Sequence, residues 1–504
     1  MIKKTAFNGF YLLFSIFAVW IFCAGFLYSS GSMVTRSGLL IFFAFAFVAV
    51  TFAAVRLPEI PKKAYKICVA VIFAVFFIAI TFFGIRTMTA PISDLKVLIE
   101  AADCWLEKGN IISYSHYFTI CKNTLGNAIF IMLMYIPVHA LGINIFSNTA
   151  EAWGITVNCI MIVLAVFFLY RIAVRFFKNR NMHIVFLLLC CVYIPFYLWA
   201  HRYYSDTLAL PFLTGSVLLY LKGRESSGKK QIVCNILCGI VLWAGYFMKG
   251  SIVITLVAVI IFSAFCDKKD VLKNAGIILI SFVISLSVWN FYVNHNSWID
   301  YSHIDTDNFP VTMWLMYGAH DEGNYSQADV DYMYSLPDYE SRKAAAAEKL
   351  KEYYSAYTPK TYIEFLNLKY GITYGNGMFD SEQYLNNQRT SNFTHYFLIE
   401  GLPFTMLFRY ISNALHFTVL ILAVISGFIN WRRKEWNAPM LLQIIMLGNI
   451  LFFSFWETKA RYAFGITPVL LFLAVYSAGS IAEYIQCKLN NKKHSPTVKE
   501  NIAV

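Results

Sequence analysis

The sequence is dominated by twelve apolar runs, each close to the 20 residues that a helix needs to cross a bilayer. Charged residues make up only 14% of the chain, against about 25% in an ordinary soluble protein. This pattern excludes a soluble enzyme, a disordered protein and a fibrous repeat, and it predicts an all-α polytopic membrane protein with about 12 transmembrane helices. The runs lie near residues 10–29, 38–55, 67–84, 152–170, 183–200, 203–221, 232–248, 250–266, 274–292, 406–430, 438–455 and 462–482.

A thirteenth apolar run, 126–142, decides the topology. If the N-terminus is cytoplasmic and this run does not cross, the predicted cytoplasmic segments hold 24 of the 41 Lys and Arg residues, and the external ones hold 22 of the 29 acids. Basic residues collect in cytoplasmic loops, so this arrangement favours twelve spans with both ends inside. Residues 126–142 then form a membrane-embedded helix on the outer side; the count is thirteen if the run crosses.

This topology divides the chain into six segments of a multi-pass protein of the cell (plasma) membrane. The net charge of +12 follows from the bias of the cytoplasmic loops, and no basic run with interleaved aromatics predicts a nucleic-acid partner. The segments are N-terminal spans (1–84), a first external loop with amphipathic and re-entrant helices (85–151), central spans (152–292), a large external loop (293–405), C-terminal spans (406–486) and a cytoplasmic tail (487–504).

Sequence motifs narrow the chemistry mainly by what is missing. The chain has no Walker loop, dinucleotide glycine motif, His-Glu-x-x-His site or Cys-x-x-Cys pair, so nucleotide-driven transport and metal-dependent hydrolysis have no support. Cys104 and Cys121 fall in the first external loop, where a disulfide between them is one alternative. Within the large external loop, residues 339–354 are rich in helix formers and predict a helix.

Two aspartates stand at the predicted outer edges of spans, where a carboxylate is costly unless it is used. Asp94 opens a stretch with apolar residues at helical spacing that Gly109 is placed to stop. Asp94 is either a helix cap or a general base or cation-holding carboxylate at the membrane surface. Asp206 is either a cap, an ion-pair partner of Arg202, or a second acid of the same site.

Several other charged or polar residues at the outer face have two interpretations each. Lys122 and Lys249 either extend their ammonium groups to the interface or bind a lipid phosphate. His320 lies in a loop and is either structural or catalytic. The cluster at the end of the run 438–455 is either an interfacial anchor or a phosphate site that uses the forked donors of arginine. That cluster contains Glu457, Lys459, Arg461 and Tyr462.

Taken in order, these parts resemble membrane glycosyltransferases of the GT-C fold, such as protein O-mannosyltransferases and the lipid A aminoarabinose transferase. An Asp directly after an early span, an amphipathic helix and a re-entrant apolar helix form the layout of that family. The resemblance covers most of the chain, and its order and sidedness carry more weight than any one short motif. The similar elements are Asp94–Gly109, Tyr204-Ser205-Asp206, Pro310–Gly318, Gly323-Asn324-Tyr325, and Glu457-x-x-x-Arg461-Tyr462 followed by Pro468.

The resemblance implies a sugar transfer from a polyprenyl-phosphate donor to an acceptor hydroxyl on the outer face, in an envelope glycan, a lipid or a protein. Asp94 would deprotonate the acceptor, and Asp206 would help to place acceptor or donor. The implied substrate-binding residues are Lys122, Tyr204, Lys249, His320, Glu457, Arg461 and Tyr462. The chain has Leu95 after Asp94 where some relatives carry Glu, and Cys121 before Lys122 where some carry Glu. These departures leave open which residue binds phosphate and whether a divalent cation is needed.

Two other classes of function fit the same composition. A transporter or flippase of a lipid-linked saccharide is the alternative to the enzyme, and a non-catalytic scaffold for wall assembly is a third hypothesis. Transporters place charges inside their spans and are often built from repeats. Here the interiors of the spans are nearly free of charge and the acids gather at one surface, which favours the enzyme.

Overall fold

The computed structural model describes residues 2–266, 271–302, 304–389 and 392–493. In these ranges the chain is built from helices, with no strand and a single isolated bridge between Thr89 and Gln388. The predicted all-α polytopic architecture is confirmed. The part of the predicted cytoplasmic tail that follows residue 493 lies outside the described residues.

Nine helices of the described chain are long and apolar enough to cross a membrane, or ten if one bent pair counts as a single span. The predicted number of twelve is therefore not confirmed. The long helices are α1 (Ile2–Tyr28), α2 (Met33–Arg56), α3 (Lys62–Arg86), α7 (Asn148–Phe176), α12 (Gly228–Met248), α14 (Val271–Asn294), α22 (Thr405–Arg433), α23 (Ala438–Phe455) and α25 (Thr467–Lys493), which continues from the short α24 (Ala460–Ala463).

The other three predicted spans form shorter helices, and two of the runs are interrupted. Run 183–200 becomes α8 (Arg180–Val192) and α9 (Ile194–Leu198), and Pro195 at the start of α9 has no N–H to continue the helix before it. Run 203–221 becomes α10 (Ser205–Leu208) and α11 (Leu210–Arg224), with Pro211 in its first turn. Run 250–266 becomes a 3-10 turn, Gly250–Ile252, followed by α13 (Val253–Cys266).

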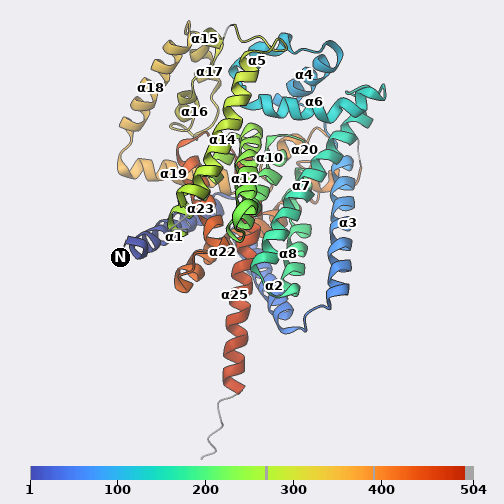
Figure 1. Cartoon of the computed structure of the whole chain (residues 1–504), viewed down its shortest axis with the longest axis vertical. Coiled ribbons are helices and arrows are strands. Elements are labelled where there is room, and N and C mark those ends of the chain that lie inside the picture. The colour runs from blue at the N-terminus through green and yellow to red at the C-terminus, as the bar shows by residue number, and fades with distance from the viewer. Residues whose placement is uncertain (1, 267–270, 303, 390–391, 494–504) are drawn as a thin grey trace, which may run out of the picture.

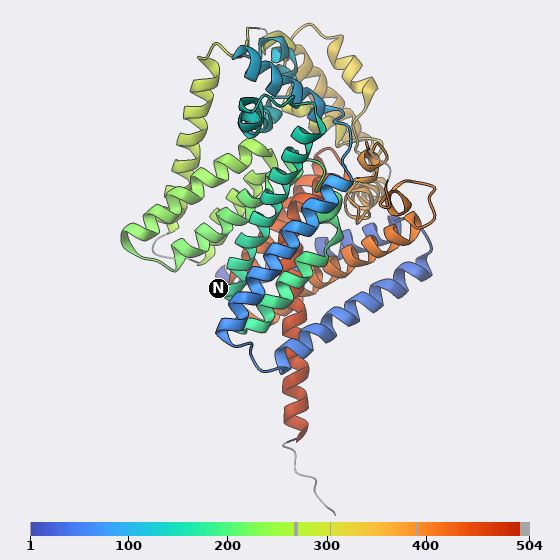
Figure 2. The ribbon, with the colours of Figure 1, turned by 90° about the vertical axis from the view of Figure 1, so that its right-hand side faces the viewer.

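The apolar run 126–142 folds as α6 (Leu125–Ala140), bent by 112° from the helical segment that precedes it. In Figure 1 α6 lies across the direction of α3 and α7, and Figure 2 views it nearly end-on. A helix in this orientation does not follow the direction of the spans, which is the arrangement expected of a helix on the outer surface. Its membrane topology stays a prediction.

The bundle is organised around α25, whose middle, Val469 to Val475, is buried. Peripheral helices instead present apolar side chains outward: Ile41 and Phe45 on α2 are 69% and 76% exposed, and Ile78 on α3 is 66% exposed. Such surfaces would be unfavourable in water and are suited to lipid contact.

The two predicted external segments meet at one end of the bundle (Figure 1). From the first come α4 (Asp94–Lys108), the turn Ile112–Tyr114, α5 (Ser115–Ile120) and the turn Lys122–Thr124. From the second come α15 (Ile304–Asp307), α16 (Val311–Tyr317), α17 (Gln327–Tyr334), α18 (Tyr339–Ala356), α19 (Pro359–Tyr374), α20 (Glu382–Leu385) and α21 (His395–Leu398). Several hydrogen bonds join the segments. In two of them, Ile111 N donates to Trp298 O (2.7 Å) and Asp300 N donates to Ser115 Oγ (2.9 Å).

The other two helices predicted within these segments are also confirmed. The stretch after Asp94 is α4, which ends at Gly109 in the left-handed conformation (φ 72°), and residues 339–354 fall within α18. A small core of its own holds the second segment together around Met313, Met316 and Met333. Cys104 and Cys121 are both free thiols, so the disulfide alternative is wrong.

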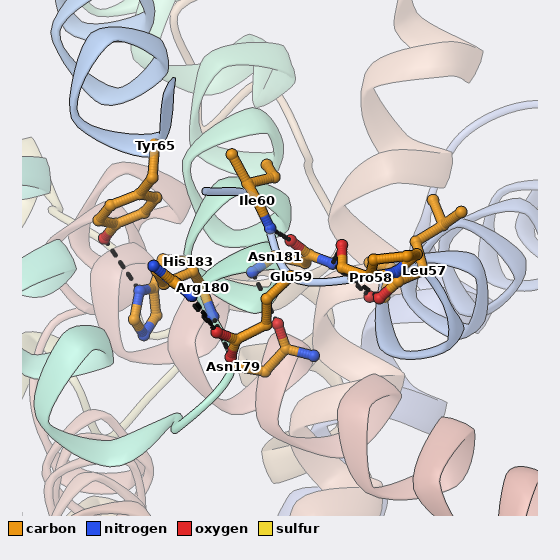
Figure 3. Close-up of polar contacts among 10 residues, drawn as sticks. Leu57, Pro58, Glu59, Ile60, Tyr65, Asn179, Arg180, Asn181 and His183 are labelled. Carbon is orange, nitrogen blue, oxygen red and sulfur yellow. Dashed lines mark hydrogen bonds and ion pairs between the residues drawn. The ribbon is translucent and has the colours of Figure 1, made fainter. Parts of the chain in front are cut away.

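At the opposite end, a polar cluster holds the loop between α2 and α3 against the start of α8 (Figure 3). The Asn181 amide nitrogen donates to three carbonyls of this region, those of Ala54, Leu57 and Pro58, and its oxygen accepts from Ile60 N at 3.0 Å. Nearby, Arg180 pairs with Glu59. We call this group of residues the α2–α3 loop cluster.

Candidate functional site

Asp94 is the first helical residue of α4. The preceding Ser93 occupies the cap position without a side-chain capping bond, so Asp94 does not cap the helix. Its Oδ2 instead accepts a hydrogen bond from the hydroxyl of Tyr204 at 2.9 Å. This bond joins two parts of the chain that are 110 residues apart.

Asp206 lies in the short α10 and is 1% exposed. Its Oδ1 accepts from the ammonium group of Lys249, and its Oδ2 has no hydrogen-bond partner among the described residues. Lys249 reaches this position because α12 ends at Met248 and the backbone of Lys249 is extended (φ −153°, ψ 114°). Asp206 therefore pairs with Lys249, not with Arg202 as the sequence allowed.

The segment between α23 and α25 supplies the third part of the site. Tyr462 donates to Glu457 Oε2 at 3.0 Å, and Lys249 Nζ lies 5.8 Å from the centre of the Tyr462 ring. The Arg461 guanidinium lies 5.7 Å from the ring centre of Tyr204. These contacts connect seven of the nine predicted site residues into one cluster: Asp94, Tyr204, Asp206, Lys249, Glu457, Arg461 and Tyr462.

The remaining two predicted residues are placed by contacts with the large external segment. His320 Nε2 lies 2.7 Å from Asp329 Oδ2, and its ring stacks on Tyr353 with centroids 4.3 Å apart. Lys122 Nζ lies 5.9 Å from the ring centre of Tyr301. Neither contact joins the cluster around Asp206, so the structure gives His320 a role in packing the external segment.

Arg202 is a member of the cluster that the sequence did not single out as a site residue. It is 2% exposed, its guanidinium lies 3.9 Å from the ring centre of Tyr384, and its Nε has no hydrogen-bond partner among the described residues. Burial and the nearby Arg461 both lower the pKa of Arg202. A buried cation in this state is stabilised by an anion.

Segment 376–384 of the external loop is a second part of the site that sequence reasoning missed. Asp380 Oδ2 accepts from the backbone N of Arg461 at 3.3 Å, and the Tyr384 hydroxyl accepts from Arg461 Nη1 at 3.0 Å. Phe379 and Asp380 have φ of 53° and 61°, a region that costs energy for residues other than glycine and is concentrated at functional sites. Burial raises the pKa of Asp380. No local pattern in the sequence marks this segment.

The donor set does not fit a metal ion held by the protein. Among the described residues there is no group of three or more His, Cys, Asp or Glu side chains that could hold one. Asp94 and Asp206 each face a donor, the Tyr204 hydroxyl and the Lys249 ammonium, which a cation would have to displace.

The fold and cluster define a multi-pass helical membrane protein with a buried site of mixed charge at one end of its bundle. The chain belongs to the family described as conserved hypothetical integral membrane protein, whose model matches residues 4–481.

Comparison with curated proteins finds no match. Among solved structures, the chain is similar to the archaeal oligosaccharyltransferase AglB from Archaeoglobus fulgidus, in complex with an inhibitory peptide and a dolichol-phosphate. The two share 10% sequence identity with a TM-score of 0.38, and the match covers 84% of this chain and 52% of that one. The chain thus spans about half the length of that protein.

Proposed function

We propose that this protein is a membrane glycosyltransferase of the GT-C type that moves a sugar from a polyprenyl-phosphate donor to an acceptor hydroxyl on the outer face of the membrane. One observation carries the proposal: an anchored carboxylate, Asp94, shares a buried cluster with three cations, Arg202, Lys249 and Arg461. The Nε atoms of both arginines have no partner among the described residues. A base beside cations with unused hydrogen-bond donors is what transfer from a phosphate leaving group requires.

In the proposed reaction, Asp94 takes the proton of the acceptor hydroxyl as its oxygen attacks the anomeric carbon of the donor sugar. The bond between that carbon and the phosphate oxygen breaks, and its electron pair leaves with the phosphate. Tyr204 donates to Asp94 Oδ2 and so orients the carboxylate with Oδ1 toward the acceptor. The three cations stabilise the charge that develops on the phosphate.

Two further features support a lipid-linked donor. Lys249 lies among apolar side chains, Leu210, Leu213, Ile252 and Ile466, so a cation and apolar groups stand side by side, as the phosphate end of a prenyl lipid requires. A donor of this kind already resides in the bilayer, so the protein needs no nucleotide-binding fold.

The test is transfer by the purified full chain in proteoliposomes, supplied with a panel of polyprenyl-phosphate-linked hexoses and pentoses and an envelope extract as acceptor. Release of polyprenyl phosphate is the readout. We expect Asp94→Asn to reduce the rate by about 10²- to 10⁴-fold, the usual contribution of a general base, with the melting temperature retained.

Glu107→Gln is the matched control, because Glu107 is an exposed carboxylate near the end of the same helix α4. It should leave the rate unchanged. Full transfer by Asp94→Asn would overturn the assigned base. Movement of an intact lipid-linked saccharide across the bilayer without release of phosphate would instead indicate a transporter.

A further inference from the structure

A cavity lined by polar side chains lies beside segment 376–384. Neither Asp94 nor Lys249 is among its lining residues. Its volume is about 160 Å³, far above the ~10–15 Å³ that one water needs. It forms where the ends of α1 and α19 meet α20 and the start of α22. The lining residues are Tyr28, Ser29, Ser30, Gly375, Asn376, Glu382, Arg409 and Asn413.

Two side chains of opposite charge face each other in this cavity without forming a close pair. Arg409 Nε lies 3.8 Å from Glu382 Oε1, and the two side chains are 21% and 16% exposed. Glu382 Oε2 and Arg409 Nε are buried and have no hydrogen-bond partner among the described residues. A buried donor or acceptor without a hydrogen bond is unfavourable, so the cavity offers both an acceptor and a donor to a ligand.

The wall of the cavity is fixed by its other polar residues. Asn413 Oδ1 accepts from Gly377 N at 2.7 Å, and its amide nitrogen donates to Ser29 Oγ at 3.0 Å. The Asn376 amide nitrogen lies 3.3 Å from Asp380 Oδ1 and 3.5 Å from Glu382 Oε1. Segment 376–384 therefore lies between the cavity and the candidate active site: Glu382 of this segment lines the cavity, and Asp380 accepts from the backbone N of Arg461.

The chemistry of the lining favours a neutral ligand with adjacent hydroxyl groups. Glu382 and Arg409 together carry no net charge, so a charged ligand would leave one charge uncompensated. A pair of neighbouring hydroxyls can donate to the carboxylate and accept from the guanidinium at the same time. Tyr28, which is 51% exposed, adds an aromatic ring at the edge of the cavity.

We propose that this cavity is a subsite for a sugar ring of a saccharide acceptor. The proposal rests on the proposed glycosyl transfer and specifies its acceptor as a carbohydrate chain, held by one ring at Glu382 and Arg409 while another ring presents its hydroxyl to Asp94.

The experiment measures the melting temperature of the purified full chain against increasing concentrations of free neutral hexoses, pentoses and disaccharides. We expect at least one of these saccharides to raise the melting temperature of the wild type saturably.

Glu382→Gln should weaken the apparent affinity at least tenfold. Ser30→Trp, which fills the cavity from an exposed position, should abolish the effect even if Glu382→Gln folds poorly. The control Glu400→Gln, at an exposed carboxylate of the external loop, should bind as the wild type does.

Two kinds of result would overturn the proposal. One is the absence of stabilisation of the wild type by any saccharide, or an equal effect in Ser30→Trp. The other is stabilisation by phosphatidylethanolamine alone that Ser30→Trp removes, which would assign the cavity to a zwitterionic headgroup. Asp94→Asn separates this proposal from the proposed function: it should still bind the saccharide without transferring sugar. If the wild type binds no free saccharide but still transfers sugar in a way that depends on Asp94, the proposed subsite is wrong and the proposed function stands.

Discussion

The α2–α3 loop cluster and the cluster around Asp206 are both built from polar residues far apart in the sequence, yet they differ in how their groups are satisfied. In the former, Asn181 uses both its amide nitrogen and its oxygen, and Arg180 pairs with Glu59 (Figure 3). In the latter, Asp206 Oδ2 and the Nε atoms of Arg202 and Arg461 are buried without partners among the described residues.

The difference teaches how to separate structural polar clusters from candidate sites. A saturated cluster contributes stability because each buried donor and acceptor keeps a partner. A buried cluster with unused donors is less favourable for folding, and a bound anion would supply the missing interactions. The number of polar residues does not distinguish the two regions; the unused hydrogen-bonding atoms do.

The largest expected effect is on catalysis. Arg202→Gln should lower the rate of transfer from a polyprenyl-phosphate sugar by about 10²- to 10³-fold, the usual loss when one group that stabilises developing charge is removed. The melting temperature should stay the same or rise, because a buried cation without an anion is removed. The assay is release of polyprenyl phosphate alongside a melting curve.

Arg180→Gln provides the matched arginine of the other cluster. It breaks a partly exposed ion pair with Glu59, so it should change stability by less than about 1 kcal/mol and leave transfer unchanged. Equal transfer rates for Arg202→Gln and the wild type would show that unused buried hydrogen-bond donors do not mark a functional site in this protein.

The second prediction concerns Lys369, a buried lysine whose hydrogen-bond donors, unlike those of Arg202, have partners. Lys369 is 0% exposed, and its ammonium group donates to the carbonyls of Trp456 (2.9 Å) and Ser454 (3.2 Å) and of Gly318. Burial lowers its pKa to about 7. Between pH 7 and pH 10.5, the ordinary pKa of lysine, Lys369 is protonated in the unfolded chain and largely neutral in the folded one. The free energy of unfolding should therefore rise with pH, by at most about 1.4 kcal/mol per pH unit.

Lys369→Met should flatten this rise, which melting curves from pH 7 to pH 10 would measure. An unchanged slope in the variant would mean that other groups cause the dependence and that the carbonyls hold Lys369 charged over the whole range.

A smaller effect is expected from Asn181→Ala in the α2–α3 loop cluster. Asn181 is 6% exposed, and its removal leaves the N–H of Ile60 and nearby carbonyls without their partner. The free energy of unfolding should fall by about 1–3 kcal/mol, seen as a lower melting temperature. Transfer per folded molecule should not change; a selective loss of transfer would show that this cluster takes part in function.

A smaller loss of stability than that of Asn181→Ala is expected from Tyr65→Phe. The Tyr65 hydroxyl contacts His183 Nδ1 at 2.9 Å (Figure 3). It also contacts the Tyr170 hydroxyl at 2.6 Å. Removing it should cost about 0.5–1.5 kcal/mol, again without effect on transfer. A larger loss would indicate that the hydroxyl also supports the neighbouring α2–α3 loop cluster. A double variant with Asn181→Ala would measure that support as non-additivity.

Much of the fold follows from local patterns, and part of the site does too. The amphipathic helix after Asp94 and its end at Gly109 could be predicted because a 3.6-residue period and a left-handed glycine are local signals. The contribution of Arg202 could not, since its lack of a carboxylate partner depends on Asp206 pairing with Lys249 instead. Asp380 could not either, because it meets Arg461 across 81 positions of sequence.

The sequence by itself determined that this chain is a helical membrane protein, because the apolar runs allow no other solvent, and it identified the acids that gather at one face. Only the tertiary structure decided that three of the twelve runs form shorter helices and that the Tyr204 hydroxyl binds Asp94. It also decided which polar atoms remain unused. The physical reason is that hydrophobicity and helix propensity are properties of neighbouring residues, whereas the partner of a buried charge is chosen when distant segments pack together.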